Sequence, residues 1–339
     1  MKCRIVLRTL PTLLALLTLW ATGSSAVAAE IIDVPEVEAA LKRGAILWDV
    51  RDAEAYAQGH IRGAVNIGDP EVVLRNLNTE DFLPIARVQQ LLGGAGIDLS
   101  KEVVVYGHRG DPAAYWGLTA VRHFGGKNSR VFHGGLEAWQ AAGQPVSREA
   151  TRLAAVEHEL TVDPSIQIYL PEVLSRVGNP EVQFLDTREP EEFNGDVVKA
   201  LRGGHIPGAL NIPFERNWVD PTALIRLAKG DATAWDGMAL KSPAQLKALY
   251  ADLDPKKETI VYCQSGVRAS ETAWVLVDLG FEQVRVFEES WLGYGNDLSA
   301  PAEDVQFVNV GALVARIAHL EAAVRKLTAV LEAQEAATK

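Results

Sequence analysis

The chain of 339 residues contains very little cysteine, with two residues of this type, and two cysteines cannot build a disulfide scaffold. It also lacks an excess of positive charge, because 33 lysines and arginines stand against 44 aspartates and glutamates, which gives a formal net charge of −11. An acidic chain repels phosphate backbones, so no nucleic-acid partner is expected. Glycine and proline, with 28 and 16 residues, are too few for a collagen-like or low-complexity chain.

A membrane-spanning run is missing at the N-terminus. The apolar stretch from Leu10 to Trp20 is shorter than the roughly 20 residues that a spanning helix needs. It follows a basic start and precedes the small residues AVAA, which is the pattern of a secretory signal peptide over residues 1–29 with cleavage near Ala28 or Ala29. An uncleaved anchor is the alternative. We therefore expect a periplasmic or secreted protein without stable insertion into a membrane.

An internal repeat organises the remaining chain. Four pairs of segments recur in the same order, with offsets that grow mainly by insertion: WDVR 48–51 and LDTR 185–188, HIRGAVNI 60–67 and HIPGALNI 205–212, VVVYG 103–107 and TIVYC 259–263, and VF 131–132 and 286–287. This pattern indicates a domain duplication. We predict a first domain over residues 30–147 and a second over residues 160–305, joined by a polar linker.

Each half alternates strand signals with helix signals. Val34–Arg43 has helical spacing and precedes the strand-like run Ala45–Val50, and each of the two β-branched runs of the third repeat pair precedes a helix-like stretch. Short apolar strands separated by helices indicate a mostly parallel sheet that is covered on both faces. The predicted fold class is therefore α/β, with two such domains in tandem.

The C-terminal segment, residues 306–335, has a different pattern. Its apolar residues recur in steps of three and four: Val310, Leu313, Ile317, Leu320, Val324, Leu327 and Leu331. This heptad spacing is typical of a coiled coil. We predict a helix that forms a homo-oligomer through residues 310–331, the alternative being a helix that packs back on its own domain.

The segment that carries chemistry is the loop after TIVY 259–262. Loss of the signal peptide leaves Cys263 as the one thiol, and the strand would deliver it to the sheet edge where parallel α/β folds bind ligands. Gly266 permits a tight turn with inward N–H groups, a helix is expected to begin near Ala269, and Arg268 adds a positive charge; each of these features favours the thiolate. We predict that Cys263 is a solvent-exposed nucleophile in a cradle for anions. A small buried hydrophobic residue is the alternative.

At these residues the sequence resembles the rhodanese family of sulfurtransferases. The resemblance covers nearly all of residues 30–305 as a tandem pair of rhodanese-like domains, and it is carried by DTRE 186–189, GHIPGA 204–209, the Cys263 loop and FEESW 287–291. It implies a catalytic second domain and an inactive first domain, because Gly107 stands where the cysteine would be. It also implies that the substrate is held by the loop residues, namely Gln264, Ser265, Gly266, Val267, Arg268 and Ala269.

The resemblance further implies a two-step transfer of sulfur. Cys263 would take the sulfane sulfur of a small anionic donor such as thiosulfate as a persulfide, and a thiophilic acceptor such as cyanide or a thiol would remove it, without a metal or an organic cofactor. The phosphatases that share this fold place five residues between cysteine and arginine, whereas four separate Cys263 from Arg268. A sulfur carrier or binding module that holds a persulfide with little turnover is the alternative from another functional class.

Three further features refine this prediction. The thiosulfate enzymes of the family carry positive charge in the loop and a second arginine nearby, whereas this chain has Gln264-Ser265 and Glu192, so thiosulfate is expected to react slowly and a persulfide or polysulfide is the other candidate donor. Asp186 and Arg188 are predicted to form a structural pair that supports the loop, with substrate binding by Arg188 as the alternative. The histidines show no spacing of metal ligands, so no zinc site is expected.

Overall fold

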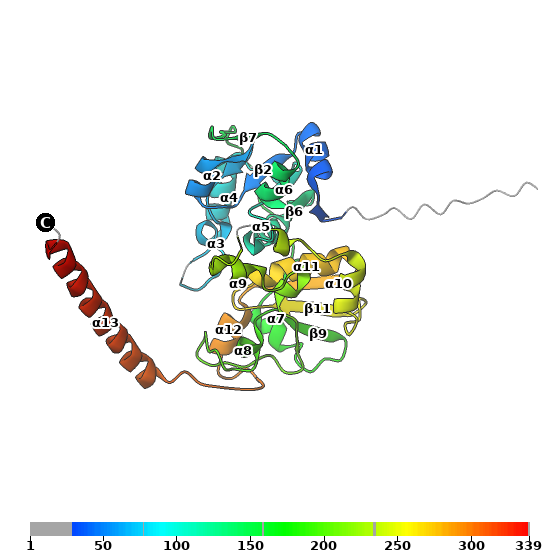
Figure 1. Cartoon of the computed structure of the whole chain (residues 1–339). Helices are drawn as coiled ribbons and strands as arrows, with labels where there is room; N and C mark the ends of the chain where they lie inside the picture. Colours follow the sequence, from blue (N-terminus) through cyan, green and yellow to red (C-terminus); the bar gives the residue numbers. More distant parts are fainter. Residues whose placement is uncertain (1–28, 77, 158, 233–234, 338–339) are drawn as a thin grey trace, which may run out of the picture.

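The computed structural model describes residues 29–337, except residues 77, 158, 233 and 234. The predicted signal peptide therefore lies, apart from Ala29, outside the described residues. Figure 1 shows two α/β units, one above the other, and a C-terminal helix that stands apart from both. Within the described part of the chain, no helix is both long enough and apolar enough to cross a membrane.

The first unit contains a five-stranded sheet in which every neighbouring pair of strands is parallel. The strand order is β1-β6-β5-β2-β4, with bounds β1 Ile31–Ile32, β6 Ser129–Phe132, β5 Val103–Tyr106, β2 Ile46–Asp49 and β4 Val65–Asn66. A short antiparallel pair lies beside it, formed by β3 His60–Ile61 and β7 Val146–Ser147. The helices of this unit are α1 Val34–Lys42, α2 Ala53–Gln58, α3 Pro70–Val73, α4 Ile85–Gly94, α5 Pro112–His123 and α6 Gly135–Ala141.

The second unit repeats this sheet. Its order is β10-β9-β11-β12-β8, again all parallel, with bounds β10 Leu210–Asn211, β9 Val182–Asp186, β11 Glu258–Tyr262, β12 Gln283–Phe287 and β8 Gln167–Ile168. Its helices are α7 Leu170–Leu174, α8 Pro190–Phe193, α9 Ala223–Ala228, α10 Pro243–Leu249, α11 Val267–Asp278 and α12 Ser290–Asn296, with the 3-10 turns η1 Phe214–Asn217 and η2 Asp236–Met238. The predicted α/β class and the duplication are confirmed.

The central strands form because their sequences suit burial on both faces. All four residues of β5, VVVY, are buried, as are the last four residues of β11. β-branched and aromatic side chains pack well on a pleated surface, and continuous apolar runs are typical of parallel strands that are covered on both sides. These two buried strands end directly before Gly107 and Cys263, so each of the two equivalent loops starts from a strand that is fixed in the core.

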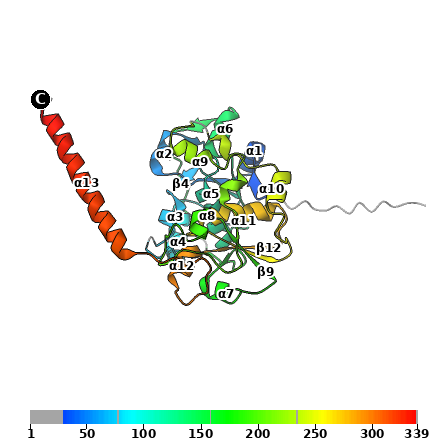
Figure 2. The same cartoon turned by 60° about the horizontal axis from the view of Figure 1, so that its bottom comes forward.

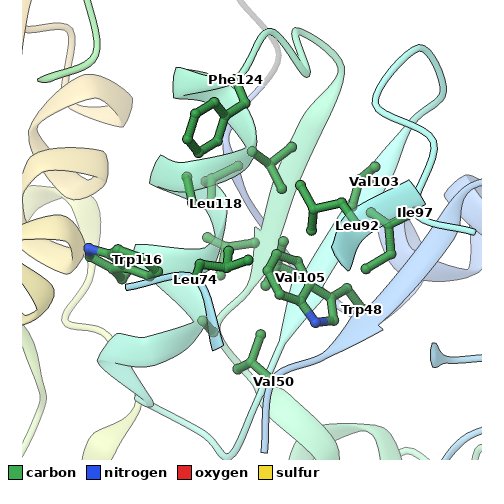
Figure 3. Packing of buried hydrophobic residues seen from close by; sticks show 14 of the residues in the cluster. Trp48, Val50, Leu74, Leu92, Ile97, Val103, Val105, Trp116, Leu118 and Phe124 are labelled. Atoms are coloured by element: carbon green, nitrogen blue, oxygen red, sulfur yellow. The ribbon is translucent and has the colours of Figure 1, made fainter. Parts of the chain in front are cut away.

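The two units meet along α5 and α11, which lie side by side in Figures 1 and 2. The hydrophobic core of the first unit includes Val267 and Trp274 of α11, so it continues across the domain boundary. The indole N–H of Trp274 donates to the hydroxyl of Thr119 on α5, with an N–O distance of 2.9 Å. Figure 3 shows this core, with Trp116 of α5 on the side where the second unit begins. Helix α11 begins directly after the Cys263 loop, and it is thus held by contacts with both units.

The C-terminal helix, α13 Val310–Ala337, is confirmed as a helix. Its apolar side chains from Val310 to Leu331 are between 48% and 64% exposed, and the helix projects away from both units in Figures 1 and 2. The alternative of a helix that packs back on its own domain does not agree with this exposure. Self-association stays a prediction.

Candidate active site

Cys263 follows β11 directly, at the carboxyl end of the central strand of the second sheet. Its backbone N–H donates to the hydroxyl of Ser290 at 3.2 Å, and its carbonyl oxygen accepts from the N–H of Trp291 at 3.0 Å. The next residue, Gln264, accepts from the N–H of Leu292 at 3.0 Å. The first turn of α12 therefore fixes the main chain at the start of the loop.

The structure corrects one expectation about Cys263. We predicted a solvent-exposed thiol, but the residue is 0% exposed and belongs to an apolar cluster that includes Leu185, Ile212 and Ala269. Leu185 and Ile212 lie far from Cys263 in the sequence, so no local pattern could reveal this burial. The adjacent side chains of Gln264 and Ser265 are only half-buried, so the solvent boundary lies at these residues.

Gly266 makes the turn from the loop into α11. Its φ of 83° lies in the left-handed region, which favours glycine, and the helix begins at Val267, two residues earlier than expected. The helix has no side-chain cap, so the N–H groups of its first turn are available to an anion. Val267, Arg268 and Ala269 all lie in this first turn, beside the cysteine.

Two residues that we did not predict lie against this turn. A Cβ atom at Gly266 would be 3.2 Å from the carbonyl oxygen of Glu288 and 3.4 Å from the guanidinium of Arg75. Arg75 comes from the first unit and binds Glu288, which follows β12, with an Nη2–Oε1 distance of 2.7 Å. Glu288 lies in the FEESW segment that carries the family resemblance, whereas Arg75 lies in none of the repeated segments, so the sequence did not mark it.

The charged side chain of the loop, Arg268, is already paired. Its two terminal nitrogens bind the two carboxylate oxygens of Glu192 at 2.8 and 3.1 Å, and Lys199 binds the same carboxylate at 3.2 Å. Burial favours the neutral acid, but the two cations outweigh it and lower the pKa of Glu192 to about 2. Glu192 is therefore an anion paired with the loop arginine. The slow reaction of thiosulfate that we expect from this residue stays a prediction.

A further carboxyl group lies within electrostatic range of Arg268. Burial, and then the neighbouring carboxylate of Glu189, raise the pKa of Glu215 to about 8. Glu215 is mostly protonated at neutral pH for this reason. Two carboxyl groups, those of Glu192 and Glu215, thus lie near Arg268, and no spacing in the sequence indicates that either one is its neighbour.

Asp186 and Arg188 form the expected pair. The guanidinium binds the carboxylate through Nε at 3.0 Å and Nη2 at 2.5 Å, donates to the carbonyl oxygen of Gly204 at 2.7 Å, and lies 4.6 Å from the ring centre of Trp291. Arg188 is only 1% exposed. These contacts fit a structural support for the loop and do not favour substrate binding by Arg188.

The equivalent loop of the first unit cannot hold a cysteine in its present form. A Cβ atom at Gly107 would collide with the carboxylate of Asp111, which caps α5 by accepting from the N–H of Ala113 at 3.0 Å. Burial raises the pKa of Asp111 to about 6. In the same loop His108 binds Glu137 at 2.6 Å. Acidic side chains thus fill the space that a nucleophile and an anion would need.

A metal centre is not evident in the described ranges, where no group of three or more His, Cys, Asp or Glu side chains could hold an ion. The groups that the site does present are a thiol at a helix N-terminus and an arginine held by a carboxylate. This arrangement suits a nucleophilic reaction on a small anion.

The comparisons with known proteins agree with this reading. The family model of the rhodanese-like domain matches residues 33–142 and 170–297. A thiosulfate sulfurtransferase of Corynebacterium glutamicum is 33% identical over 264 residues, which cover 74% of this chain and 82% of that protein.

Among solved structures, the fold is similar to that of the anaerobic ergothioneine biosynthesis enzyme from Chlorobium limicola in complex with trimethyl histidine. The TM-score is 0.68 at 21% identity, covering 81% of this chain and 70% of the other. The wild-type structure of EanB gives the same TM-score and identity, with 69% of its chain covered. Because both identities are low, these structures support the fold alone. The family model and the curated relative establish that the chain belongs to the rhodanese family and is a sulfurtransferase.

Proposed function

We propose that this sulfurtransferase moves a sulfane sulfur from a donor such as thiosulfate to a thiophilic acceptor, cyanide or a thiol, through a persulfide on Cys263. The observation that carries the proposal is the position of Cys263 between the end of β11 and the uncapped N-terminus of α11. A helix N-terminus favours a thiolate over a thiol, and the thiolate is the nucleophilic form.

The reaction has two displacements. In the first, the Cys263 thiolate bonds to the outer sulfur of thiosulfate, the S–S bond of the donor breaks, and sulfite leaves with the electron pair of that bond. In the second, the acceptor bonds to the terminal sulfur of the persulfide, and Cys263 leaves as the thiolate; with cyanide the product is thiocyanate. Two displacements of moderate difficulty replace one direct transfer.

The loop residues contribute fixed dipoles to both steps. The backbone N–H groups from Gln264 to Ala269 are proposed to stabilise the terminal sulfur anion, with Gly266 setting the turn that directs them inward. Since Cys263 is buried, the donor is proposed to enter past the half-buried side chains of Gln264 and Ser265, which must move aside.

The burial of Cys263 also favours a second candidate, a sulfur carrier. A persulfide at a residue that is 0% exposed would be shielded from solvent, and it would be delivered slowly to a dedicated acceptor. The carrier and the enzyme share the first displacement but differ in the rate of the second.

The test is thiocyanate formation from thiosulfate and cyanide by the wild-type chain and by Cys263→Ser, with Ser175→Ala at the exposed end of α7 as the control. We expect turnover in the wild type and in the control and none in Cys263→Ser. Turnover in Cys263→Ser contradicts the proposal. A wild-type chain that gains the mass of one sulfur atom on Cys263, but forms no thiocyanate with any donor, is a carrier.

We further propose that residues 1–29 direct export to the periplasm or the medium, with cleavage near Ala28 or Ala29. N-terminal sequencing of the exported protein tests this proposal, and intact N-terminal residues would contradict it.

The α13 helix is proposed to hold two copies of the chain together through its heptad positions, because a second copy would cover the apolar residues that it exposes.

A further inference from the structure

The connection between α8 and the GHIPGA segment is longer than its counterpart in the first unit. In each unit an aromatic ring stacks on a histidine: Tyr56 on His60 with the ring centres 3.8 Å apart, and Phe193 on His205 with the ring centres 3.6 Å apart. Three residues separate the first pair and eleven separate the second, so the unit that carries the nucleophile has eight additional residues here. We call this insertion, residues 196–203, the inserted loop.

The inserted loop leaves the second unit and returns to it at almost the same point. A Cβ atom at Gly203 would be 2.8 Å from the Cα atom of Gly195, and one at Gly195 would be 3.2 Å from the backbone nitrogen of Gly204. A surface loop whose two ends adjoin in this way is an Ω-loop, a kind of loop that is frequently functional. Because the first unit forms the same sheet without the insertion, the fold itself does not explain its presence.

The inserted loop crosses the residue that follows the nucleophile. The carbonyl oxygen of Lys199 accepts from the side chain of Gln264 at 3.0 Å, and its ammonium binds the carboxylate of Glu192 on α8 at 3.2 Å. On the other side, the backbone N–H of Leu201 donates to the side chain of Asn296, the last residue of α12, at 2.8 Å. The inserted loop therefore spans from α8 to α12 across the start of the reactive loop.

The inserted loop is anchored at one end and exposed along the rest of its length. None of the side chains from residue 196 to residue 201 is buried. Arg202 is only 5% exposed, and its guanidinium donates to the carbonyl oxygens of Asp297 and Ala300, both at 2.8 Å. Segments without buried side chains open at a low cost in free energy. The part of the loop that crosses Gln264 can therefore lift while Arg202 stays in place.

We propose that the inserted loop determines specificity for the sulfur acceptor by size: a small thiophile reaches the Cys263 persulfide past the closed loop, whereas a bulky thiol must first displace it. This inference rests on the proposed transfer through Cys263 and specifies its second displacement. It accounts for a nucleophile that is 0% exposed, and for an insertion in the unit that carries the nucleophile but not in the unit that has Gly107 in its place.

The step concerned is the same for every thiol. The thiolate of the acceptor bonds to the terminal sulfur of the persulfide, the S–S bond breaks, and Cys263 leaves as the thiolate with the electron pair of that bond. The acceptor becomes a persulfide, so neither an oxidant nor a reductant is consumed. Two acceptors with the same reacting group and different bulk, 2-mercaptoethanol and glutathione, therefore differ mainly in their access to the persulfide.

The first measurement uses the wild-type chain alone. Cys263 is loaded with sulfur from thiosulfate and freed of donor, and the loss of one sulfur atom from it is followed by mass spectrometry after addition of either thiol. The ratio of the two rate constants is compared with the ratio for a free persulfide in solution, that of N-acetylcysteine. We expect the protein to favour 2-mercaptoethanol by at least about tenfold more than the free persulfide does.

The second measurement uses a variant that releases the inserted loop without shortening the chain. Lys199→Met combined with Asn296→Ala removes the contacts with Glu192 and α12, and we expect the rate constant for glutathione to rise by about tenfold and that for 2-mercaptoethanol by less than about threefold. Loss of the Lys199 ammonium would by charge alone slow the anionic glutathione, so a rise reports access.

The matched control is Lys257→Met combined with Asn179→Ala. Lys257 binds the carbonyl oxygen of Pro180 at 2.7 Å, and the side chain of Asn179 accepts from the N–H of Glu181 at 3.0 Å. These residues lie before β11 and β9, at the edge of the sheet opposite to Cys263. Both rate constants should stay at their wild-type values in this control.

A wild-type ratio equal to that of the free persulfide overturns the inference, and this measurement does not depend on the folding of any variant. An unchanged ratio in the released variant, or a shift toward 2-mercaptoethanol, overturns it as well. These outcomes leave transfer through Cys263 intact. A wild-type chain in which no donor places sulfur on Cys263 instead contradicts the proposed function, and the inference falls with it.

Discussion

Arg75 of the first unit and Glu288 of the second form a buried ion pair across the domain boundary, with Nη2 and Oε1 2.7 Å apart and the two side chains only 2% and 0% exposed. The guanidinium also lies 4.3 Å from the ring centre of Trp116. Because both groups lie against Gly266, the unit without a nucleophile contributes to the support of the reactive loop.

Removing one partner of this pair should destabilise the fold strongly. Arg75→Met leaves Glu288 without its counter-ion in a buried position, and we expect a loss of about 3–5 kcal/mol in the free energy of unfolding, measured by urea denaturation. Arg43→Met is the control, because Arg43 binds Glu102 at the surface and its side chain is 50% exposed; its loss should stay below about 1 kcal/mol. Equal losses in the two variants would contradict the structural role of the pair.

The stability of the domain interface should depend on pH through His133. Its ring lies 2.7 Å from the hydroxyl of Tyr115 and 2.8 Å from the carbonyl oxygen of Met238 in the second unit, and burial lowers its pKa to about 4. The folded state therefore binds fewer protons than the unfolded state between pH 6.5 and 4. The stabilisation that comes from the neutral ring is complete above pH 6.5 and is lost as the pH falls toward 4.

The measurement is the difference in the free energy of unfolding between the wild type and His133→Gln at a series of pH values. This difference should decrease as the pH falls from 6.5 to 4, by an amount on the order of 3 kcal/mol. The comparison with the variant is needed because the raised pKa values of Glu71 and Asp111 make the free energy of unfolding increase as the pH falls, and they do so in both proteins. His319→Gln on the exposed α13 serves as the control, and a constant difference for His133→Gln would rule out this role.

The first unit should not regain activity by a single substitution. Gly107→Cys in the Cys263→Ser background is expected to give no thiocyanate, because the new side chain meets the carboxylate of Asp111. Gly107→Ala should destabilise the fold by about 1–3 kcal/mol. Gly94→Ala in α4, where a Cβ atom would meet open space, should instead stabilise it slightly. Recovered activity in the double variant would show that the loop adapts to a cysteine.

The proposed role of α13 can be tested by a charge in its apolar seam. Leu320→Asp places a carboxylate at a heptad position and should reduce the solution mass by half, as should deletion of residues 306–339. Ala322→Asp adds the same charge on the opposite side of the helix and should leave the mass unchanged. Measurement is by light scattering, and a wild-type chain with the mass of a monomer would remove the dimer proposal.

The fold was predictable because its information is local. β-branched runs such as Val103–Tyr106 identify central strands, and their recurrence at Thr259–Tyr262 identifies the duplication. The turn at Gly266 and the pairing of Asp186 with Arg188 were predictable for the same reason, since these residues lie within one loop or a few positions of one another.

The rest of the site depends on contacts between distant segments. Cys263 belongs to an apolar cluster with Leu185 and Ile212, which lie far from it in the sequence, and no pattern near position 263 indicates them. Glu192 was recognised as a difference from the family's well-known thiosulfate enzymes, but whether it faced the loop depended on the path of the chain after β9. Arg75 acts across the domain boundary, and no repeat partner points to it.

The central claim is most directly tested by a single turnover at Cys263. The reduced protein is mixed with excess thiosulfate, freed of donor, and analysed by intact-protein and peptide mass spectrometry before and after addition of cyanide. The account predicts a gain of one sulfur atom on Cys263, with one sulfite released per chain, and its complete loss as one thiocyanate. Thiocyanate formed without a sulfur-bearing Cys263, or formed equally by Cys263→Ser, would contradict it.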